Sequence, residues 1–558
     1  MAHLALLTLG ALYSAYAGGV APDGAAGGLG VAAASAGGIL YVPFPVWSRQ
    51  SGRPGAGGRQ ALSLGDGDGR GRPSLPRQGP VRMKLLFIIP PPMHYLEASA
   101  NERLDKNREH RPTLGVLAVA SYIEKHRPQH AIRIIDAPSE DYTLDDVVRL
   151  FKEYDPDVVG FTAMTFTLLD VLEAVRAVKA AKPDVRTVLG GWHPTYYPKE
   201  TLMQPGVDVV VGGEGEQTFA EFCDALEANC ERPELEKVAG LAYKTASGEF
   251  AVNPPRPKIE DLDSLPIPNY NLVDLNRYQH VLGSGGVTLA LQSSRGCPFA
   301  CTFCDIRRSR FRQRSSESVV DELEHWTRQG IRSFFFVDDN FVVNRRWTIE
   351  TCKMIVERKL DIEFKISGRI DRANLEMYEW LARAGCSRIN FGVESFEQVN
   401  LDYLIKGTKV EQIGAAFAMA RQAGLKAFAY MIVGFPRQNE WEMYRELVHL
   451  ARVRADFASF AVLSAYPRTP LYERLLQDGV FPRDFWREFA ERPTADFTMP
   501  LVSRRYNREK LRRIQVRMTQ FFYFNPLFLG RAVLSIRSAA QLKNYARVAL
   551  NLARRVRR

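Results

Sequence analysis

The sequence Arg295-Gly296-Cys297-Pro298-Phe299-Ala300-Cys301-Thr302-Phe303-Cys304-Asp305 places three thiols within eight residues, at the spacing C-x3-C-x2-C. Three thiolates on one short loop can each bind one iron of an iron–sulfur cluster and leave the fourth iron without a protein ligand. A zinc site and buried free cysteines are the other interpretations, but zinc requires a fourth ligand, and no second cysteine pair follows Cys304 at such a spacing. The spacing therefore favours a [4Fe–4S] cluster bound by Cys297, Cys301 and Cys304.

This run resembles the cluster loop of the radical S-adenosylmethionine (radical SAM) superfamily. In that family the open iron is chelated by the amino and carboxylate groups of S-adenosyl-L-methionine (SAM), and the aromatic residue before the last cysteine, here Phe303, lies near the adenine. The resemblance implies [4Fe–4S] and SAM as cofactors, and a reductant such as flavodoxin or ferredoxin as a partner.

Length and composition fit a multidomain globular protein. With 558 residues, 46% of them hydrophobic and 25% charged, the chain is long enough for three or four domains. Its seven cysteines, an odd number, argue against a disulfide framework and predict a reducing, cytoplasmic compartment. The four cysteines outside the cluster motif are predicted to be small apolar residues of the core: Cys223, Cys230, Cys352 and Cys386.

Residues 1–82 are rich in Ala and Gly, and then in Gly, Arg, Pro and Ser, without a sustained apolar period. This composition predicts a disordered, low-complexity extension. Because Met83-Lys84 leads directly into a first predicted strand, we interpret the extension as a mis-assigned upstream start, with a transit peptide as the alternative.

Residues 83–230 alternate short apolar runs with helical patterns, which predicts an α/β domain with a Rossmann-like, doubly wound parallel sheet. Ligands of such sheets bind beyond the carboxyl ends of the strands. The expected strands are 85–89, 132–135, 158–162, 187–189 and 207–211.

Three loops at these strand ends have unusual compositions. They read Thr162-Ala163-Met164-Thr165, Gly190-Gly191-Trp192-His193-Pro194 and Gly212-Gly213-Glu214-Gly215-Glu216, and glycines allow backbone to approach a large ligand. Singly, a Gly-Gly pair is often a tight turn and a lone His is more often packed than a ligand. Their order before a C-x3-C-x2-C motif resembles the cobalamin-binding domain of B12-dependent radical SAM enzymes. The resemblance implies cobalamin contacts from Asp136, Thr165, Gly190, Gly191, His193, Gly213, Glu214 and Gly215.

Many B12-binding domains carry Asp-x-His-x-x-Gly, whose His is the lower axial ligand of cobalt. Here the matching segment reads Asp136-Ala137-Pro138-Ser139-Glu140-Asp141, with Pro138 in place of the His. Proline has no donor nitrogen, so the resemblance implies cobalamin without a histidine ligand from this loop.

A connector, residues 231–285, contains Pro-rich stretches that predict a linker without regular elements. A second alternation fills residues 286–480, with expected strands at 287–292, 333–337, 363–367, 388–392, 426–432 and 457–463. These strands predict a partial (β/α)6 TIM-type barrel, the fold that the radical SAM resemblance implies, with functional residues at the strand carboxyl ends.

Asp338 and Asp339 follow the second barrel strand, where the superfamily often has a Gly-Gly-Glu-like segment that holds the amino group of SAM. Adjacent carboxylates can accept hydrogen bonds from an ammonium group, although a solvated strand end is the alternative. The sequence does not choose between the two acids. By the same resemblance, further SAM contacts are expected from Ser367, Arg369, Glu394 and Gly434.

Other roles also remain open for barrel residues. A buried salt bridge between Arg369 and Glu394 is the alternative to SAM contacts for that pair. Arg468 and Tyr466, in a segment resembling Pro-Gly-Thr-Pro-Leu-Tyr, are substrate-side candidates.

Residues 481–558 form a predicted basic helical region. From residue 501 onward there are fifteen Lys or Arg and one acid. The net charge of this tail is therefore larger than the net charge of the whole chain, +11, and residues 1–500 together are slightly negative. We expect the tail to cap the barrel and to contact an anionic membrane surface, peripheral to the inner face. Nucleic-acid binding is not expected, because no recognisable module accompanies the charge.

The combined resemblance implies an enzyme that forms a 5′-deoxyadenosyl radical from SAM and methylates an unactivated carbon of a small-molecule or lipid substrate through cobalamin. One alternative is an oxidative cyclase or another ring-forming enzyme, resembling the anaerobic magnesium-protoporphyrin monomethyl ester cyclase. Another is a non-catalytic cobalamin carrier or sensor, for which the three cluster cysteines would have no use.

Overall fold

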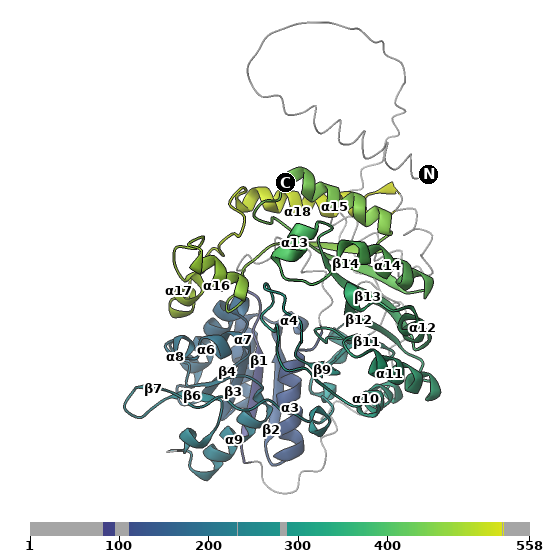
Figure 1. Cartoon of the computed structure of the whole chain (residues 1–558). Coiled ribbons are helices and arrows are strands. Elements are labelled where there is room, and N and C mark those ends of the chain that lie inside the picture. Colours follow the sequence, from purple (N-terminus) through teal and green to yellow (C-terminus); the bar gives the residue numbers. More distant parts are fainter. Residues whose placement is uncertain (1–81, 95–110, 232, 279–286, 527, 529–558) are drawn as a thin grey trace, which may run out of the picture. The chain divides into compact units, whose positions relative to one another are not determined.

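The computed structural model describes residues 82–94, 111–231, 233–278, 287–526 and 528 (Figure 1). All of them belong to one compact unit, residues 77–558. The predictions for the extension before Arg82 and for the last part of the tail lie outside the described residues.

The first sheet has seven strands in the order β2-β1-β3-β4-β5-β6-β7. Its parallel part confirms the predicted doubly wound sheet, and the chain reverses direction across the sheet at β1, which has β2 on one side and β3 on the other. The parallel strands are β1 (Lys84–Ile89), β2 (Ala131–Asp136), β3 (Val158–Thr162), β4 (Arg186–Gly190) and β5 (Val209–Val211).

The prediction that the connector contains no regular elements is wrong. Two antiparallel strands, β6 (Leu241–Lys244) and β7 (Phe250–Val252), extend the first sheet from β5. Both precede the proline run that begins at Pro254, so proline removes no hydrogen bond from their ladder.

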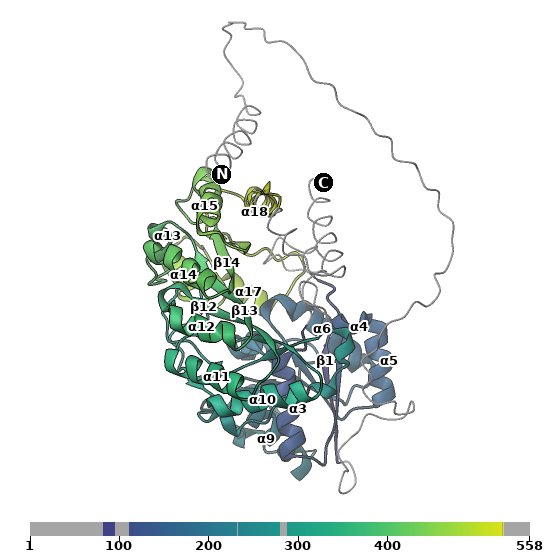
Figure 2. The same ribbon diagram turned by 90° about the vertical axis from the view of Figure 1, so that its right-hand side faces the viewer.

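Helices cover both faces of this sheet (Figures 1 and 2). Residues of α3 (Leu114–His126) and α9 (Gly215–Ala228) share one apolar core with the barrel helices, while those of α5 (Leu144–Tyr154) and α6 (Leu168–Ala181) lie in a second core. The second core also contains barrel residues such as Leu404, Ile432 and Leu463. Apolar burial therefore joins the two sheets on both faces.

The second sheet has six parallel strands in the order β15-β14-β13-β12-β11-β8, so each strand lies beside the one before it in the chain. This order confirms the predicted partial (β/α)6 barrel. Its strands are β8 (Thr288–Leu291), β11 (Ser333–Phe336), β12 (Glu363–Arg369), β13 (Cys386–Glu394), β14 (Lys426–Val433) and β15 (Phe457–Val462). Helices α10 (Ser316–Arg328), α11 (Arg345–Glu357), α12 (Leu375–Arg383), α14 (Val410–Gln422) and α15 (Glu440–Val453) alternate with them.

The described part of the tail contains α18 (Arg508–Tyr523), which packs on the edge strand β15. Gln515 Nε2 donates to Phe460 O at 2.5 Å, and Tyr523 Oη donates to Ala458 O at 2.8 Å. These bonds pair backbone groups that the edge strand would leave open. None of the helices in the described ranges combines the length and apolar character needed to cross a bilayer.

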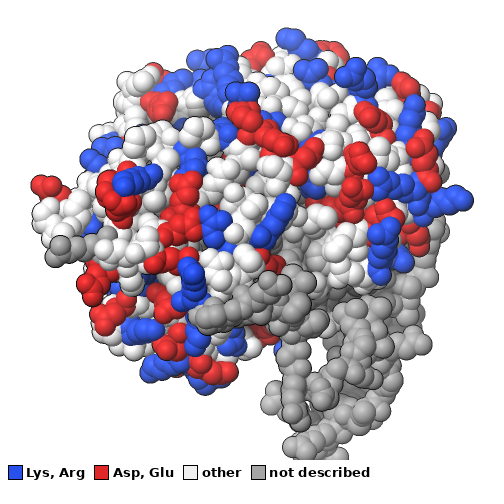
Figure 3. All heavy atoms as spheres, turned by 90° about the horizontal axis from the view of Figure 1, so that it is seen from below, with Lys and Arg blue, Asp and Glu red and all other residues white. Residues whose placement is uncertain are grey.

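Acidic and basic side chains are interspersed on the described part of the face seen from below (Figure 3). This mixture fits a chain whose excess positive charge lies mainly after residue 500.

Candidate two-cofactor site

The cluster loop, residues 296–311, is closed at its base by a two-stranded antiparallel ladder. Strand β9 (Ser294–Arg295) pairs with β10 (Arg312–Gln313), with Arg295 opposite Arg312. Gly296 has φ +89°, and a Cβ atom there would lie 2.3 Å from Arg310 O. Only glycine can start this loop without displacing its other end.

The three predicted cluster ligands lie near one another in this loop. Cys301 is buried, while Cys297 and Cys304 are partly exposed. Burial raises the pKa of Cys297 and raises that of Cys304 to about 12, although a backbone N–H donor to each sulfur opposes the shift. Within the described ranges, no three His, Cys, Asp or Glu side chains are placed to hold a single metal ion. Three cysteines on one short loop fit a cluster, in which each cysteine binds a different iron.

Arg369, at the end of β12, supports the cluster loop. Its Nη1 donates to Cys301 Sγ at 3.3 Å, and its guanidinium carbon lies 4.0 Å from the centre of the Phe299 ring. Its Nε donates to Asp371 Oδ1 at 2.8 Å. The alternative salt bridge between Arg369 and Glu394 is not formed, because each has another partner. A donor on a cluster sulfur is a recognised way to tune an iron–sulfur centre.

Glu394 ends β13 in a left-handed conformation, with φ +66°, and its Oε1 lies 2.7 Å from Lys406 Nζ. Both side chains are buried, and Lys406 Nζ lies 5.8 Å from the centre of the Phe303 ring. Gly392 leaves room for the pair, since a Cβ there would lie 2.6 Å from the Glu394 carboxylate. The structure thus brings together two predicted SAM contacts, Glu394 and Phe303, through a lysine that the sequence analysis did not identify.

The structure distinguishes the two adjacent acids that follow β11. Asp338 is buried and accepts hydrogen bonds from Ser293 N and Oγ and from Ser294 Oγ. Its carboxylate is therefore committed to the segment that leads into the cluster loop. Asp339 is exposed and accepts from the backbone N–H of Gly296. Of the two, Asp339 is the acid available to a ligand beside the cluster loop.

Two other predicted SAM contacts have structural partners. Ser367 O accepts from Phe341 N at 3.0 Å, which orders the backbone after β11. Gly434 has φ +83°, and a Cβ there would lie 3.1 Å from Leu511 of α18. The tail helix therefore packs against Gly434, which the sequence alone could not indicate.

The segments after β3 and β4 bring together Thr165, Gly190, Gly191 and His193. The segment that we call the loop after β4 includes the short helix α7 (Trp192–Tyr196). Ala163 N donates to Gly190 O at 2.8 Å, and His193 N donates to Ala163 O at 3.1 Å. His193 is fully buried, its Nδ1 lies 3.2 Å from Thr165 Oγ1, and burial lowers its pKa to about 3. The imidazole is therefore neutral and helps to order the loops.

The same two loops carry Met164 and Trp192, each 43% exposed. Large apolar side chains left in solvent beside closely approaching backbone are typical of a binding surface for a broad, partly apolar ligand. A corrin ring fits this description, so the residues present agree with cobalamin at the carboxyl ends of β3 and β4.

The segment after β2 forms a short helix, α4 (Ala137–Glu140), with Pro138 in its first turn. Asp136 is buried and its Oδ2 accepts from Tyr278 Oη at 2.7 Å. Its carboxylate thus holds the connector, and the helix offers no histidine to cobalt.

Gly213, Glu214 and Gly215 lie between β5 and α9. Gly213 N donates to Thr195 Oγ1 at 3.0 Å, which joins this loop to the one after β4. Gly215 begins α9, while the Glu214 side chain points to Arg312 and Arg295 of the cluster-loop base. Glu214 therefore has protein partners at the place where a cobalamin contact was expected.

The cluster loop and the loop after β4 touch. Asp305 Oδ2 accepts from Tyr196 Oη at 3.1 Å, and Arg468 Nη2 donates to Tyr196 O at 3.2 Å. The Tyr466 and Phe166 rings meet edge to face at 5.5 Å between centres. The two substrate-side candidates, Arg468 and Tyr466, thus lie where the two sheets meet.

Gly191 provides a test of the β4 loop. Its φ of +101° and ψ of −173° are accessible almost only to glycine, and a Cβ would lie 2.7 Å from Ala163 O. We expect Gly191→Ala to lower the free energy of unfolding by about 2–4 kcal/mol and to reduce bound cobalamin. Thermal unfolding and the absorbance of bound cobalamin measure both effects.

Gly213→Ala is the matched control, because Gly213 also has positive φ, +75°, but no atom lies within 4 Å of the added Cβ. Its expected cost is about 1 kcal/mol. Equal losses of stability in the two variants would contradict the tight approach at Gly191.

Glu446 of α15 holds the backbone beyond Glu394. It is buried, and its carboxylate accepts from Ser395 Oγ at 2.5 Å and from Phe396 N at 2.8 Å. Burial outweighs these bonds and raises its pKa from 4.5 to about 7. Because the folded pKa exceeds the unfolded one, the stabilising contribution is complete below the unfolded pKa and is lost as pH rises through the folded pKa.

We therefore expect the melting temperature of the wild type to fall, relative to Glu446→Gln, between about pH 5 and about pH 8. Thermal unfolding across this range measures the difference, and Glu411→Gln, a change in an exposed glutamate of α14, is the control. A wild type that gains stability relative to Glu446→Gln as pH rises would contradict the assignment.

Two family models match the chain, one to each sheet. The B12 binding domain matches residues 108–223, and the Radical SAM superfamily matches residues 291–450. The B12 binding domain precedes the Radical SAM domain along the chain, which is the order predicted from the sequence.

Relatives cover most of the chain. An uncharacterized methyltransferase of Pyrococcus horikoshii is 32% identical over 454 residues, which are 80% of this chain and 94% of the relative. The anaerobic magnesium-protoporphyrin IX monomethyl ester cyclase of Rubrivivax gelatinosus is 29% identical over 65% of this chain and 66% of its own length. The solved structure of OxsB, a cobalamin-dependent S-adenosylmethionine radical enzyme with aqua-cobalamin and S-adenosylmethionine bound, is similar with a TM-score of 0.62 at 18% identity, over 84% of this chain and 71% of that one.

The matched domains identify the cofactors as cobalamin, a [4Fe–4S] cluster and SAM. The cysteine loop, the exposed acid beside it and the glycine-lined loops of the first sheet fit these groups. The chain belongs to the cobalamin-dependent radical SAM enzymes.

Proposed function

We propose that this protein methylates an unactivated carbon of a small organic molecule or lipid. The observation that carries the proposal is the contact between the two cofactor-bearing loops: Asp305, next to Cys304, meets Tyr196 of the loop after β4 at 3.1 Å. A substrate bound beside this contact is within reach of both cofactors.

When bound, SAM and the reduced cluster supply a 5′-deoxyadenosyl radical that removes a hydrogen atom from the substrate, and cobalamin supplies the methyl group. The residues of the chain align these groups and exclude water. Asp339, beside the cluster loop, would accept from the SAM ammonium, and the buried Glu394–Lys406 pair with Phe303 would contribute to holding SAM.

Aromatic side chains favour an apolar substrate. Phe166 and Tyr466 pack edge to face, and Trp192 lies 5.6 Å from Tyr196, between ring centres. Such walls exclude water from a reactive carbon and bind rings or alkyl chains through apolar contact.

Two partners complete the proposal. A flavodoxin or ferredoxin supplies the low-potential electron. The basic tail contacts an anionic membrane that presents a lipid substrate.

Two relatives point to different outcomes. The chain matches 94% of the methyltransferase but 66% of the cyclase, which favours methylation over ring formation. A carrier or sensor role has no support, because the cluster loop, its closing ladder and the acid beside it are all present.

The test is transfer of an isotope label. Protein reconstituted without oxygen with cobalamin and the cluster is given trideuteromethyl SAM, a reductant and a small-molecule extract from a strain lacking the gene. We expect mass spectrometry to find a product that gains one trideuteromethyl group. A product changed only in hydrogen or oxygen, without added carbon, would support the cyclase alternative and contradict methylation.

A further inference from the structure

Glu214 joins the first sheet to the base of the cluster loop. Its two carboxylate oxygens accept from Arg312 Nη1 at 3.0 Å and Nη2 at 2.7 Å, a two-pronged contact. Arg295, opposite Arg312 in the β9–β10 ladder, lies 3.6 Å from Glu214 and 2.6 Å from Glu216. Two carboxylates and two guanidinium groups thus form one neutral set, which we call the Glu214 ion cluster.

The Glu214 ion cluster is largely shielded from water. The side chains of Arg312 and Glu216 are 5% and 4% exposed, and those of Arg295 and Glu214 are 16% and 20% exposed. Removing one charge from a buried set leaves another uncompensated, which costs far more than breaking a surface pair. Separating the four side chains would incur the same free-energy cost, so their relative positions are strongly restrained.

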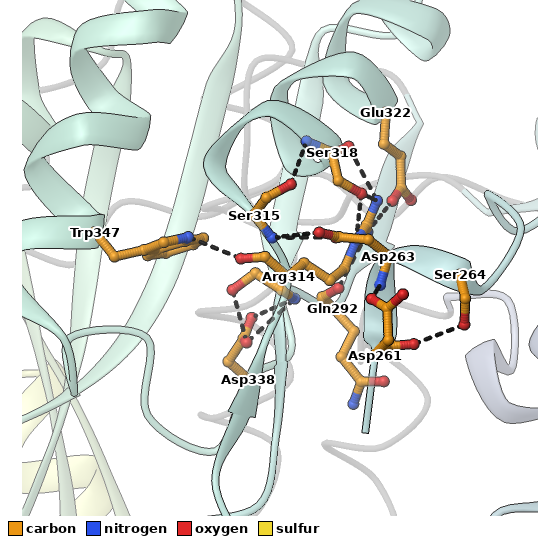
Figure 4. Close-up of polar contacts among 11 residues, drawn as sticks. Asp261, Asp263, Ser264, Gln292, Arg314, Ser315, Ser318, Glu322, Asp338 and Trp347 are labelled. Atoms are coloured by element: carbon orange, nitrogen blue, oxygen red, sulfur yellow. Dashed lines mark hydrogen bonds and ion pairs between the residues drawn. The ribbon is translucent and has the colours of Figure 1, made fainter. Parts of the chain in front are cut away.

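A third segment converges on Glu214. Ile259 N, in the connector, donates to Glu214 Oε2 at 2.8 Å, while Ile259 O accepts from Arg312 Nη1 at 2.6 Å. The chain after Arg312 is also fixed: Arg314 lies in the polar network of Figure 4, and Ser315 N donates to Asp263 of the connector.

Few residues separate the Glu214 ion cluster from the predicted cobalamin contacts on one side and from the first cluster cysteine on the other. The preceding residue, Gly213, donates to Thr195 of the loop after β4. Arg295, on the other side of the ion cluster, is separated from Cys297 by Gly296 alone. One carboxylate therefore links the cobalamin-binding edge to the first cluster ligand through short connections.

We propose that Glu214 is a positioning residue that fixes the separation and orientation of the cobalamin-binding edge relative to the cluster loop, rather than a ligand of cobalamin. Its consequence for catalysis rests on the proposed methyl transfer: without Glu214, SAM is still cleaved, but cleavage is uncoupled from methylation.

The test uses the whole protein carrying both cofactors. The magnetic interaction between reduced cluster and cob(II)alamin depends steeply on their separation, and the microwave-power saturation of the cobalamin signal in electron paramagnetic resonance reports it without any substrate. For Glu214→Gln we expect wild-type amounts of both cofactors and a weaker, more heterogeneous relaxation enhancement. In the same protein carrying both cofactors, hydrogen exchange is expected to be about tenfold faster than in the wild type in peptides covering residues 293–315.

Glu221→Gln is the matched control. Glu221 lies on the same α9 helix and pairs with Arg256 of the connector, away from the cluster loop. It should match the wild type in both measurements. Glu214→Asp, which keeps the charge, should recover part of the relaxation enhancement and provides a second variant if Glu214→Gln does not fold.

Two results would overturn the proposal. One is an unchanged relaxation enhancement and hydrogen exchange in Glu214→Gln; the other is loss of cobalamin from both Glu214 variants at unchanged exchange, which would make Glu214 a cobalamin ligand. Absence of methyl transfer by the wild type would instead contradict the proposed function, and the resonance measurement would still report the separation.

Discussion

Replacing Cys301 with alanine is expected to abolish formation of 5′-deoxyadenosine. Cys301 is the buried member of the three cluster cysteines and the one whose sulfur accepts from Arg369. Without it one iron loses its protein ligand, and the guanidinium faces an apolar methyl group. We expect iron content and the cluster absorbance to fall sharply and SAM cleavage to decrease by about 10³-fold or more.

Cys230→Ala is the control for loss of a thiol, because Cys230 lies outside the cluster loop and is exposed; its predicted place in the core is wrong, whereas Cys223, Cys352 and Cys386 are buried as predicted. It should keep the cluster and wild-type cleavage. SAM cleavage by Cys301→Ala at the wild-type rate would show that the cluster is bound elsewhere.

Replacing Asp339 with asparagine is expected to have the next largest effect. The amide keeps the shape of the side chain but loses the negative charge that we propose to meet the SAM ammonium. Loss of one charge-assisted hydrogen bond of this kind corresponds to about 10- to 100-fold weaker SAM binding. Equilibrium dialysis with labelled SAM measures the change in affinity, and the rate of 5′-deoxyadenosine formation should fall with it at limiting SAM.

Asp338→Asn separates this role from a structural one. Asp338 is buried and holds Ser293 and Ser294, so its amide variant should lower the melting temperature. It should weaken SAM binding less than Asp339→Asn does in protein that remains folded. The reverse order of SAM affinities would assign the SAM contact to Asp338.

The fold could be predicted from local pattern. Alternating apolar runs and helical periods locate both parallel sheets, because buried parallel strands are continuously apolar and their crossovers need helices. The cluster loop was equally accessible, since all three ligands lie in one short segment. The sequence does not indicate strands β6 and β7, because the prolines that follow them favour a linker.

The pairing of distant charges could not be read from the sequence. Lys406 reaches Glu394 across an intervening helix, and Glu214 meets Arg312 from another sheet altogether. Neither pairing changes the periodic pattern of apolar residues, so the sequence does not indicate it. Adjacent residues with identical chemistry are equally ambiguous: only the hydrogen bonds from Ser293 and Ser294 separate Asp338 from Asp339.

Glycines show the same limit. Gly296 stands in the sequence directly before Cys297, whereas the close contact at Gly434 comes from Leu511, on the tail helix. A residue whose constraint comes from a far part of the chain is explained only when the packing is known.

The central claim is that one active site couples SAM cleavage at the cluster loop to methylation through cobalamin. The most direct measurement is a single incubation of the reconstituted protein with trideuteromethyl SAM and the extract of the gene-deletion strain, in which 5′-deoxyadenosine and labelled product are quantified together. The account predicts that both form, that both disappear in Cys301→Ala, and that the labelled product also requires cobalamin. Labelled product that forms without cobalamin, or in Cys301→Ala, would contradict it.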